Sequence, residues 1–313
     1  MKLSPKDRQK LEANPTLFLA TAIKEYVAAS TVNQTPDYNK KPAIAEPVIG
    51  FADGRDPIFQ EYKKKAIIGD FHLTPEEALA TYLERQQKNV RDKRASAISV
   101  ISVAFTPSRE TRRSNQPKAA MASPRWSYTY GRAFGLMSET LNQVVSLLEA
   151  SGYQAVAPVC TRPMSIQISP DGLPYTDWSE KHAAYAAGLG TFGLHTSLIT
   201  ASGIPLHLGS VITDIALTPT PRVYDNHRAY CLHYRNDSCQ LCAKHCPSGA
   251  VNTQSFDGKK CLFYAQNELP KLNRKLHGEP EKEGHPMCAL CQIRVPCEAG
   301  IPPEKSSNVG RNS

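Results

Sequence analysis

The sequence predicts an α+β chain in which a mixed α/β part precedes a compact cysteine-rich module. Two observations carry this prediction. First, residues 97–105 are typical of a buried strand, residues 134–151 of an amphipathic helix and residues 155–159 of a second strand, an order that indicates a mixed α/β layer. Second, eight of the nine cysteines lie between Cys231 and Cys297.

The N-terminal third carries helix starts. Ser4-Pro5 and Asn14-Pro15 each place proline in a first helical turn. An apolar stripe on the second helix consists of Leu17, Leu19, Ala22, Ile23 and Val27. The run from Thr74 to Glu77 is a capping box, which predicts a helix to about Gln87.

The α/β layer follows. Residues 97–105 (AISVISVAF) are rich in β-branched side chains, which favours a buried strand. We expect the polar, basic segment 106–125 to be a long loop, either functional or disordered. The stripe of the next helix consists of Phe134, Met137, Leu141, Val144, Val145 and Leu148. Gly152 is expected to end that helix before the strand at 155–159.

Residues 188–193 spell G-x-G-x-x-G, a pattern known from dinucleotide-binding proteins. That fingerprint needs a strand before it and a helix after it, whereas here a helix from Ser179 to Ala187 precedes and a strand at 197–200 follows. We therefore expect a helix C-cap and a tight turn whose bare backbone can approach a large flat cofactor. Residues 203–205 predict a hairpin turn leading into a strand at 207–217.

The first cysteine group is Cys239-x2-Cys242-x3-Cys246-Pro247, close to the ferredoxin run C-x2-C-x2-C-x3-C-P. Asn236 stands where the leading cysteine would be, and Cys231 is the nearest substitute. The second group consists of Cys261, Cys288, Cys291 and Cys297.

Eight thiolates are the number that two [4Fe–4S] clusters need. Under the ferredoxin crossover rule, one cluster takes Cys231, Cys239, Cys242 and Cys297. The other cluster takes Cys246, Cys261, Cys288 and Cys291. Two zinc sites, each held by four cysteines, remain an alternative, although the closing C-x3-C-P favours iron–sulfur over zinc. Disulfides are disfavoured, because no signal peptide is evident and 313 residues can form a core without them.

The formal charge of +8 raises the question of a nucleic-acid partner. Ligating thiolates and two oxidised clusters would together add about −4, which leaves a mildly basic holoprotein. We expect the basic groups at 63–65, 91–94 and 109–113 to be solvated faces. No apolar run is long enough to span a bilayer, and no targeting segment is evident, so we expect a cytoplasmic protein without a membrane partner.

Four motifs in order, 178–182, 188–193, 198–200 and 209–214, precede the cysteine module. In these motifs the chain resembles the cobalamin-dependent iron–sulfur reductases, namely the epoxyqueuosine reductases and the catalytic core of reductive dehalogenases. The resemblance spans roughly residues 48–300. It implies a nitroreductase-like α/β core that binds a corrinoid (cobalamin), with a two-cluster ferredoxin-like module passing electrons to cobalt.

The resemblance also implies a division of the chain: an N-terminal helical arm at 1–47, a nitroreductase-like corrinoid-binding domain at 48–225, a ferredoxin-like domain at 226–301 and a flexible tail at 302–313. The residues expected to bind the cofactor are Gly188, Gly190, Gly193, His195, Gly209 and Ser210. A histidine ligand on cobalt is not expected, because the resemblance implies a base-off corrinoid.

The proton donor departs from both groups of relatives. Epoxyqueuosine reductases carry Asp-Tyr-His in the segment that corresponds to residues 130–134, where this chain has Ala133-Phe134. Reductive dehalogenases use a tyrosine with a basic neighbour as the acid. We therefore expect Tyr130, supported by Arg132, to be the catalytic pair, against the alternative of a tyrosine that merely packs at a helix entry.

The sequence thus predicts a corrinoid-dependent oxidoreductase that acts on a small-molecule substrate and receives electrons from reduced ferredoxin or flavodoxin. Two alternatives remain. One is a 2×[4Fe–4S] electron-transfer protein without a corrinoid. The other is an epoxyqueuosine-type tRNA-modifying enzyme, with the basic segment 106–125 as the tRNA contact.

Overall fold

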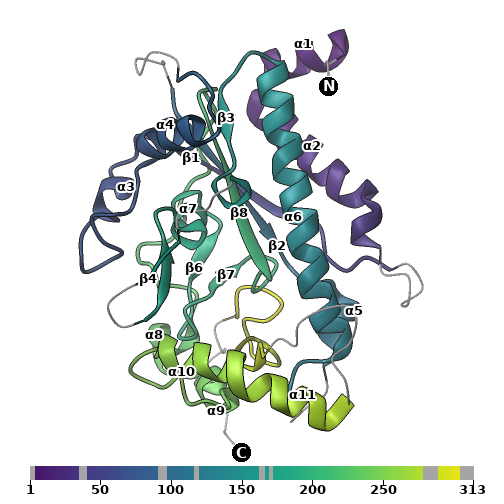
Figure 1. Ribbon diagram of the computed structural model, residues 1–313, viewed down its shortest axis with the longest axis vertical. Coiled ribbons are helices and arrows are strands. Elements are labelled where there is room, and N and C mark those ends of the chain that lie inside the picture. Colours follow the sequence, from purple (N-terminus) through teal and green to yellow (C-terminus); the bar gives the residue numbers. More distant parts are fainter. Residues whose placement is uncertain are drawn as a thin grey trace, which may run out of the picture.

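The computed structural model describes residues 4–34, 41–90, 97–115, 120–161, 166–168, 172–277 and 288–303 (Figure 1). The basic run at 91–94 and most of the tail at 302–313 lie outside these residues. The fold is mixed α and β, as the sequence predicts. Across the described ranges, every helix is too short or too polar to pass through a lipid bilayer.

A four-stranded antiparallel sheet forms the centre of the α/β part, in the order β1-β2-β8-β3. Its strands are β1 (Val48–Asp53), β2 (Ser99–Phe105), β8 (His207–Thr213) and β3 (Ala155–Val156). All seven residues of β2 are buried, which confirms the strand expected from β-branched content. The strands expected at 155–159 and 207–217 are shorter than predicted, because β3 ends where Pro158 begins a 3-10 turn (η3, Pro158–Cys160).

Alternating side chains of the sheet face two different helical layers. Ile101 and Val103 pack with α6 (Pro124–Ala150) in the largest apolar cluster. Val100 and Ile212 point the other way, into a second cluster. That second cluster is completed by side chains from α3 (Ile58–Glu61), α4 (Pro75–Arg85) and α7 (Glu180–Ala186). The sheet therefore has helices on both faces, as Figure 1 shows.

The N-terminal helices α1 (Pro5–Ala13) and α2 (Pro15–Ala29) begin at the predicted caps. The Ser4 hydroxyl accepts from the Asp7 amide, and the Asn14 side chain accepts from the Leu17 amide. Buried residues of α2 pack in the same cluster as α6, so this arm is part of the core. Leu17 was wrongly placed in the apolar stripe, since 63% of it is exposed.

Helix α6 begins ten residues earlier than expected. Ser123 caps it by accepting from the Trp126 amide, with Pro124 in the first turn. This is the same signal as Ser4-Pro5, but it lay within a segment that was predicted to be a loop. The short helix α5 (Arg109–Arg113) occupies another part of that segment. Phe134, at 38% exposure, faces outward and is wrong as a stripe residue.

The glycine-rich segment forms the expected C-cap, with Gly188 at φ +75° after α7. A strand that the sequence did not reveal follows: β6 (Gly190–Phe192) pairs with β7 (Leu198–Thr200). A Cβ at Gly190 would lie 1.9 Å from the Ile199 carbonyl oxygen, so pairing requires glycine there. A turn occurs at 200–203, slightly before the predicted 203–205, but the hairpin is wrong, because β7 and β8 belong to different sheets.

The cysteine module lies at the opposite end of the molecule from α1, below the β6–β7 pair in Figure 1. Its helical turns are α8 (Leu232–Asn236), α9 (Leu241–His245), α10 (Gly258–Phe263), the π-helical η4 (Tyr264–Glu268), α11 (Leu269–His277) and η5 (Leu290–Gln292). The remaining elements are η1 (Thr31–Asn33) and the pair β4 (Ile166–Ile168) and β5 (Pro174–Thr176).

Candidate metal centres and the cavity beside them

One set of four cysteines, two of them buried, lines a small pocket of about 20 Å³. We call it the enclosed set; it consists of Cys231, Cys239, Cys242 and Cys297. Two of its members, Cys231 and Cys242, are buried in an apolar cluster with Leu194 and Ile199. Burial raises the pKa of Cys242 to about 11, so these thiols lie where a negative charge is costly without a cation.

His195 lies against the enclosed set, with its Nε2 atom 3.5 Å from Cys297 Sγ. Its Nδ1 accepts from the Ser197 amide at 3.1 Å, so the ring proton is on Nε2 and points to the sulfur. Burial lowers the pKa of His195 to about 4, which keeps the ring neutral near pH 7. A Cβ at Gly193 would lie 2.6 Å from this ring, so the glycine makes room for the histidine.

The other four cysteines border a much larger cavity, of about 890 Å³. We call them the open set; it consists of Cys246, Cys261, Cys288 and Cys291. The facing wall comes from the α/β part and includes residues of α6, α7 and β8, namely Trp126, Tyr130, Glu180, Lys181, His207 and Leu208. The cavity therefore lies between the two parts of the chain.

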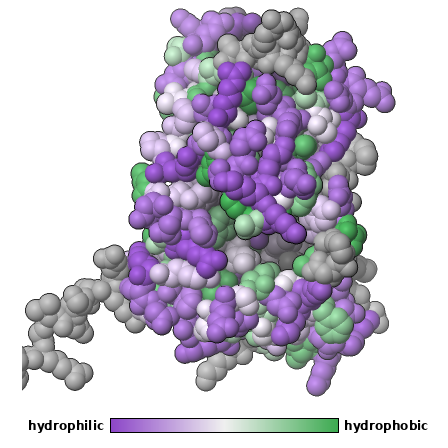
Figure 2. All heavy atoms as spheres, turned by 90° about the vertical axis from the view of Figure 1, so that its left-hand side faces the viewer, coloured by the Kyte–Doolittle hydropathy of each residue, from purple (hydrophilic) through white to green (hydrophobic). Residues whose placement is uncertain are grey.

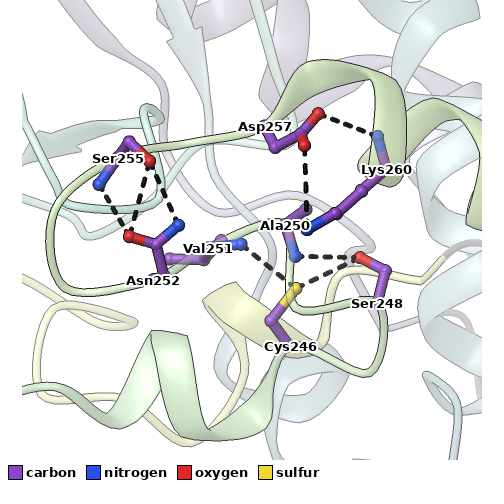
Figure 3. A network of polar contacts seen from close by, with 8 residues as sticks. All are labelled: Cys246, Ser248, Ala250, Val251, Asn252, Ser255, Asp257 and Lys260. Atoms are coloured by element: carbon purple, nitrogen blue, oxygen red, sulfur yellow. Dashed lines mark hydrogen bonds and ion pairs between the residues drawn. The ribbon is translucent and has the colours of Figure 1, made fainter.

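Cys246 is the member of the open set with a defined hydrogen-bond environment (Figure 3). The Val251 amide donates to its Sγ atom at 3.4 Å, and the Ser248 hydroxyl lies 3.4 Å from the same atom. Ser248 Oγ accepts from the Ala250 amide, which leaves the hydroxyl proton for the sulfur. Burial raises the pKa of Cys246, but these hydrogen bonds outweigh it and the net pKa is lowered.

Two polar side chains in the cavity wall have no partner among the described residues. They are the indole N–H of Trp126 and the carboxyl group of Glu180, and all three polar atoms are buried. Burial raises the pKa of Glu180 to about 8. Neighbouring Lys181 is exposed and donates to the Thr196 carbonyl at 3.3 Å, and its charge interacts with Cys291 and Cys261.

The structure brings together only some of the residues expected from the sequence. Tyr130 borders the cavity, and burial raises its pKa. Arg132 points away, since its Nε atom donates to the Val32 carbonyl and its guanidinium lies over the Tyr128 ring. Arg132 is therefore outside the cavity lining, and the pairing with Tyr130 is not supported.

The glycines expected at the cofactor lie inside the α/β part. A Cβ at Gly188 would be 3.0 Å from the Pro221 carbonyl, and one at Gly209 would be 2.6 Å from Leu141 of α6. Ser210 is fully buried and accepts from the Trp178 indole at 2.9 Å. These residues pack inside the α/β part and do not line the cavity themselves.

Sequence reasoning missed Trp126 and Glu180 as site residues. Glu180 stands inside the quoted 178–182 motif, and a carboxylate in the first turn of a helix is usually dismissed as a solvated cap. Trp126 lies between the segment 106–125, predicted to be a loop, and the helix predicted from residue 134, so neither prediction covered it. Within the described ranges, no three Cys, His, Asp or Glu side chains converge closely enough to hold a single metal ion.

Neither a protein-family model nor a curated protein matches this sequence. The matches are solved structures of reductases. Epoxyqueuosine reductase from Streptococcus thermophilus matches with 16% identity over 92% of this chain and 68% of its own, at a TM-score of 0.46. An epoxyqueuosine reductase bound to a tRNA-Tyr stem loop matches at a TM-score of 0.40, with 16% identity over 92% of this chain and 67% of its own.

A catabolic reductive dehalogenase matches with 13% identity over 81% of this chain and 34% of its own, at a TM-score of 0.40. The match thus spans about a third of the dehalogenase. These are the two groups that the sequence resembles. At such identities neither activity carries over to this chain, and the activity must be argued from its own residues.

Proposed function

We propose that the chain is a cytoplasmic corrinoid-dependent iron–sulfur reductase that reduces a small molecule in the 890 Å³ cavity. One observation carries the proposal: the enclosed and open sets are the two groups of four that the ferredoxin crossover rule predicts. One group borders the cavity and the other lies behind it. Electrons supplied by reduced ferredoxin or flavodoxin would pass through both before reaching the cavity.

The chemistry of the two cysteine sets suits iron–sulfur clusters. All eight ligands are soft thiols, which iron–sulfur clusters select. A [4Fe–4S] cluster distributes four thiolates over four irons, so its ligands need not converge on one point as they do around a single tetrahedral ion. The cysteines of each set border a common pocket, and among the described residues no three ligand side chains converge on a single ion. This supports clusters over single tetrahedral ions.

The cavity suits a corrinoid in size and chemistry. Its volume of about 890 Å³ is near the upper end of the range for cofactor sites. A corrinoid carries peripheral amides, which can accept from Trp126 and hydrogen-bond with Glu180, the two groups that lack partners. When bound, it would supply a low-potential cobalt centre for the reduction.

The residues of this chain would then bind and position the corrinoid and shield it from water. Trp126 and Glu180 would orient the cofactor edge, while Leu198, Leu206 and Leu208 exclude water from the cavity. Lys181 places a positive charge near Cys261 and Cys291, which offsets the negative charge of a thiolate-ligated cluster. Tyr130 and Glu180 are the two acids of the α/β wall.

Anaerobic reconstitution with iron, sulfide and hydroxocobalamin tests the proposal. We expect a stoichiometric cobalamin complex with a changed visible spectrum, and about tenfold weaker binding in Trp126→Phe, which removes one donor to the cofactor. Leu17→Ala, on the exposed surface of α2, is the matched control. Redox-active clusters without cobalamin uptake would instead identify the electron-transfer alternative.

A further inference from the structure

Glu180 is a buried acid without a satisfactory partner. It begins α7 and borders the 890 Å³ cavity. Neither carboxyl oxygen has a hydrogen bond of acceptable geometry to a described residue, although the Ser210 hydroxyl and the Trp178 indole lie near enough to lower its pKa. The Ser210 hydroxyl accepts from the Trp178 indole at 2.9 Å, which leaves its own proton for Glu180. Burial outweighs these contacts, so the neutral acid is favoured.

We propose that Glu180 is held as a neutral carboxylic acid and donates the proton that the substrate takes up during reduction. The proposal rests on the function proposed above and deepens it by assigning the acid. It corrects the sequence-based expectation that Tyr130 plays this role. Glu180 borders the cavity, so its proton is held beside whatever is reduced there.

The step balances for a substrate with a carbon–X bond, where X is a halogen or an oxygen leaving group. The C–X bond breaks and X leaves with its electron pair. The two electrons would be supplied by the low-potential donor through the clusters that the two cysteine sets would hold. The new C–H bond takes its proton from Glu180, which becomes a carboxylate and is reprotonated from solvent before the next turnover.

Two acids compete for this role in the α/β wall. Burial raises the pKa of both Tyr130 and Glu180, the former from an ordinary value of 10 and the latter to about 8. An acid with a pKa near the working pH is the more effective donor, which favours Glu180. Tyr130 also packs its ring 4.3 Å from the His207 ring, centroid to centroid, a contact that suits a wall residue.

Other titratable groups surround Glu180 and bear on any pH profile. Those that border the same cavity are Lys181 on α7, Tyr130 on α6, His207 on β8, Tyr264 on η4 and the thiols of the open set. His72 and His182 lie near the start of α7, where burial lowers the pKa of each to about 4. Neither histidine therefore titrates near pH 8.

Infrared spectroscopy of the reconstituted holoprotein tests the protonation. We expect the carbonyl stretch of one protonated carboxyl group at pH 6–7, lost as the pH rises through about 8. Glu180→Gln should lack this band, and Glu84→Gln, at an exposed position on α4, should keep it. Absence of the band from the wild type, or its survival in Glu180→Gln, overturns the inference.

Chloroform formation from carbon tetrachloride, with titanium(III) as reductant, tests the donation. The wild-type rate should fall above about pH 8, and Glu180→Gln should be at least about tenfold slower at pH 7 and without that fall. Tyr130→Phe should keep the wild-type pH profile. Equal rates and profiles in wild type and Glu180→Gln overturn the donor role. The wild type could instead form no chloroform although its infrared band still titrates. That result would overturn the proposed corrinoid function and, with it, proton donation by Glu180.

Discussion

The enclosed and open cysteine sets have the same ligand chemistry in two different environments. Cys231 and Cys242 are buried in an apolar cluster around a pocket of about 20 Å³. In the open set, Cys261 is exposed and its neighbours border about 890 Å³. Because burial disfavours the extra negative charge of a reduced cluster, we expect the enclosed cluster to have the more negative potential. Electron flow from the enclosed to the open set is then downhill, toward the cavity.

Removing one ligand from each set gives the largest expected effect. Cys297→Ala and Cys261→Ala should each lose one cluster, about four of eight irons, with loss of half of the visible charge-transfer absorbance. Cys297→Ala should also lower the melting temperature more, because its set is part of an apolar core. Cys160→Ala is the control and should keep both clusters. Equal iron in all three variants would contradict the division into two sets.

The contact that holds the enclosed set against the α/β part can be broken separately. Gly203 has φ +97°, and a Cβ there would lie 2.1 Å from the carbonyl oxygen of Glu298, the residue after Cys297. We expect Gly203→Ala to destabilise the holoprotein by roughly 2–4 kcal/mol in thermal unfolding. Gly135→Ala on α6 meets nothing within 4 Å and should gain about 0.5–1 kcal/mol. Similar melting temperatures for both variants would show that the close approach of Gly203 to Glu298 does not stabilise the protein.

Glu180 gives the open side a pH dependence opposite in sign to the one that His195 gives the enclosed side. Its pKa rises from 4.5 in the unfolded chain to about 8, so the folded state binds more protons between these values. Buried histidines whose pKa is lowered to about 4, such as His195 and His182, have the opposite effect below about pH 6.5. From about pH 6.5 to 9, stability should therefore fall as the pH rises, by about 2 kcal/mol. Glu180→Gln should remove this slope in denaturant unfolding at pH 6.5, 7.5 and 9, and Glu84→Gln should retain it. A wild-type stability that is flat over this range contradicts the buried acid.

The smallest effect concerns the hydrogen bonds to Cys246. Ser248→Ala removes one donor to the sulfur, and Ser255→Ala in the same loop removes only contacts to Asn252 (Figure 3). A hydrogen bond worth about 1 kcal/mol more to the reduced cluster corresponds to about 40 mV for one electron. We expect Ser248→Ala to lower the potential of the open cluster by about this amount in an EPR redox titration. A shift of equal size in Ser255→Ala would argue against the assignment.

Local signals in the sequence predicted local structure well. Ser4, Asn14 and Thr74 cap the helices they were expected to cap, and the apolar run at 99–105 is a buried strand. The ferredoxin crossover rule groups the thiols as the two pockets do, with Cys246 apart from Cys242 on the same loop. Their role as cluster ligands stays a prediction. The Ser123 cap carried the same signal and was lost inside a basic segment.

The residues that line the cavity could not be predicted from their spacing in the sequence. Glu180 and Trp126 are 54 positions apart and become neighbours of one cavity only when α6 and α7 pack on opposite faces of the sheet. The glycine motif suggested a cofactor surface, but tertiary packing uses Gly190 to pair strands and Gly193 to admit His195. The face shown in Figure 2 is hydrophilic over most of its area and hollowed, a feature that composition alone does not locate.

Iron and acid-labile sulfide, counted per chain after anaerobic reconstitution, test the central claim most directly. Two sets of four thiolates, one enclosed and one facing the cavity, predict about eight irons and about eight sulfides, with little zinc. Zinc at about two per chain, or four irons or fewer, would contradict the account, because the cavity would then have no pair of clusters from which to draw electrons.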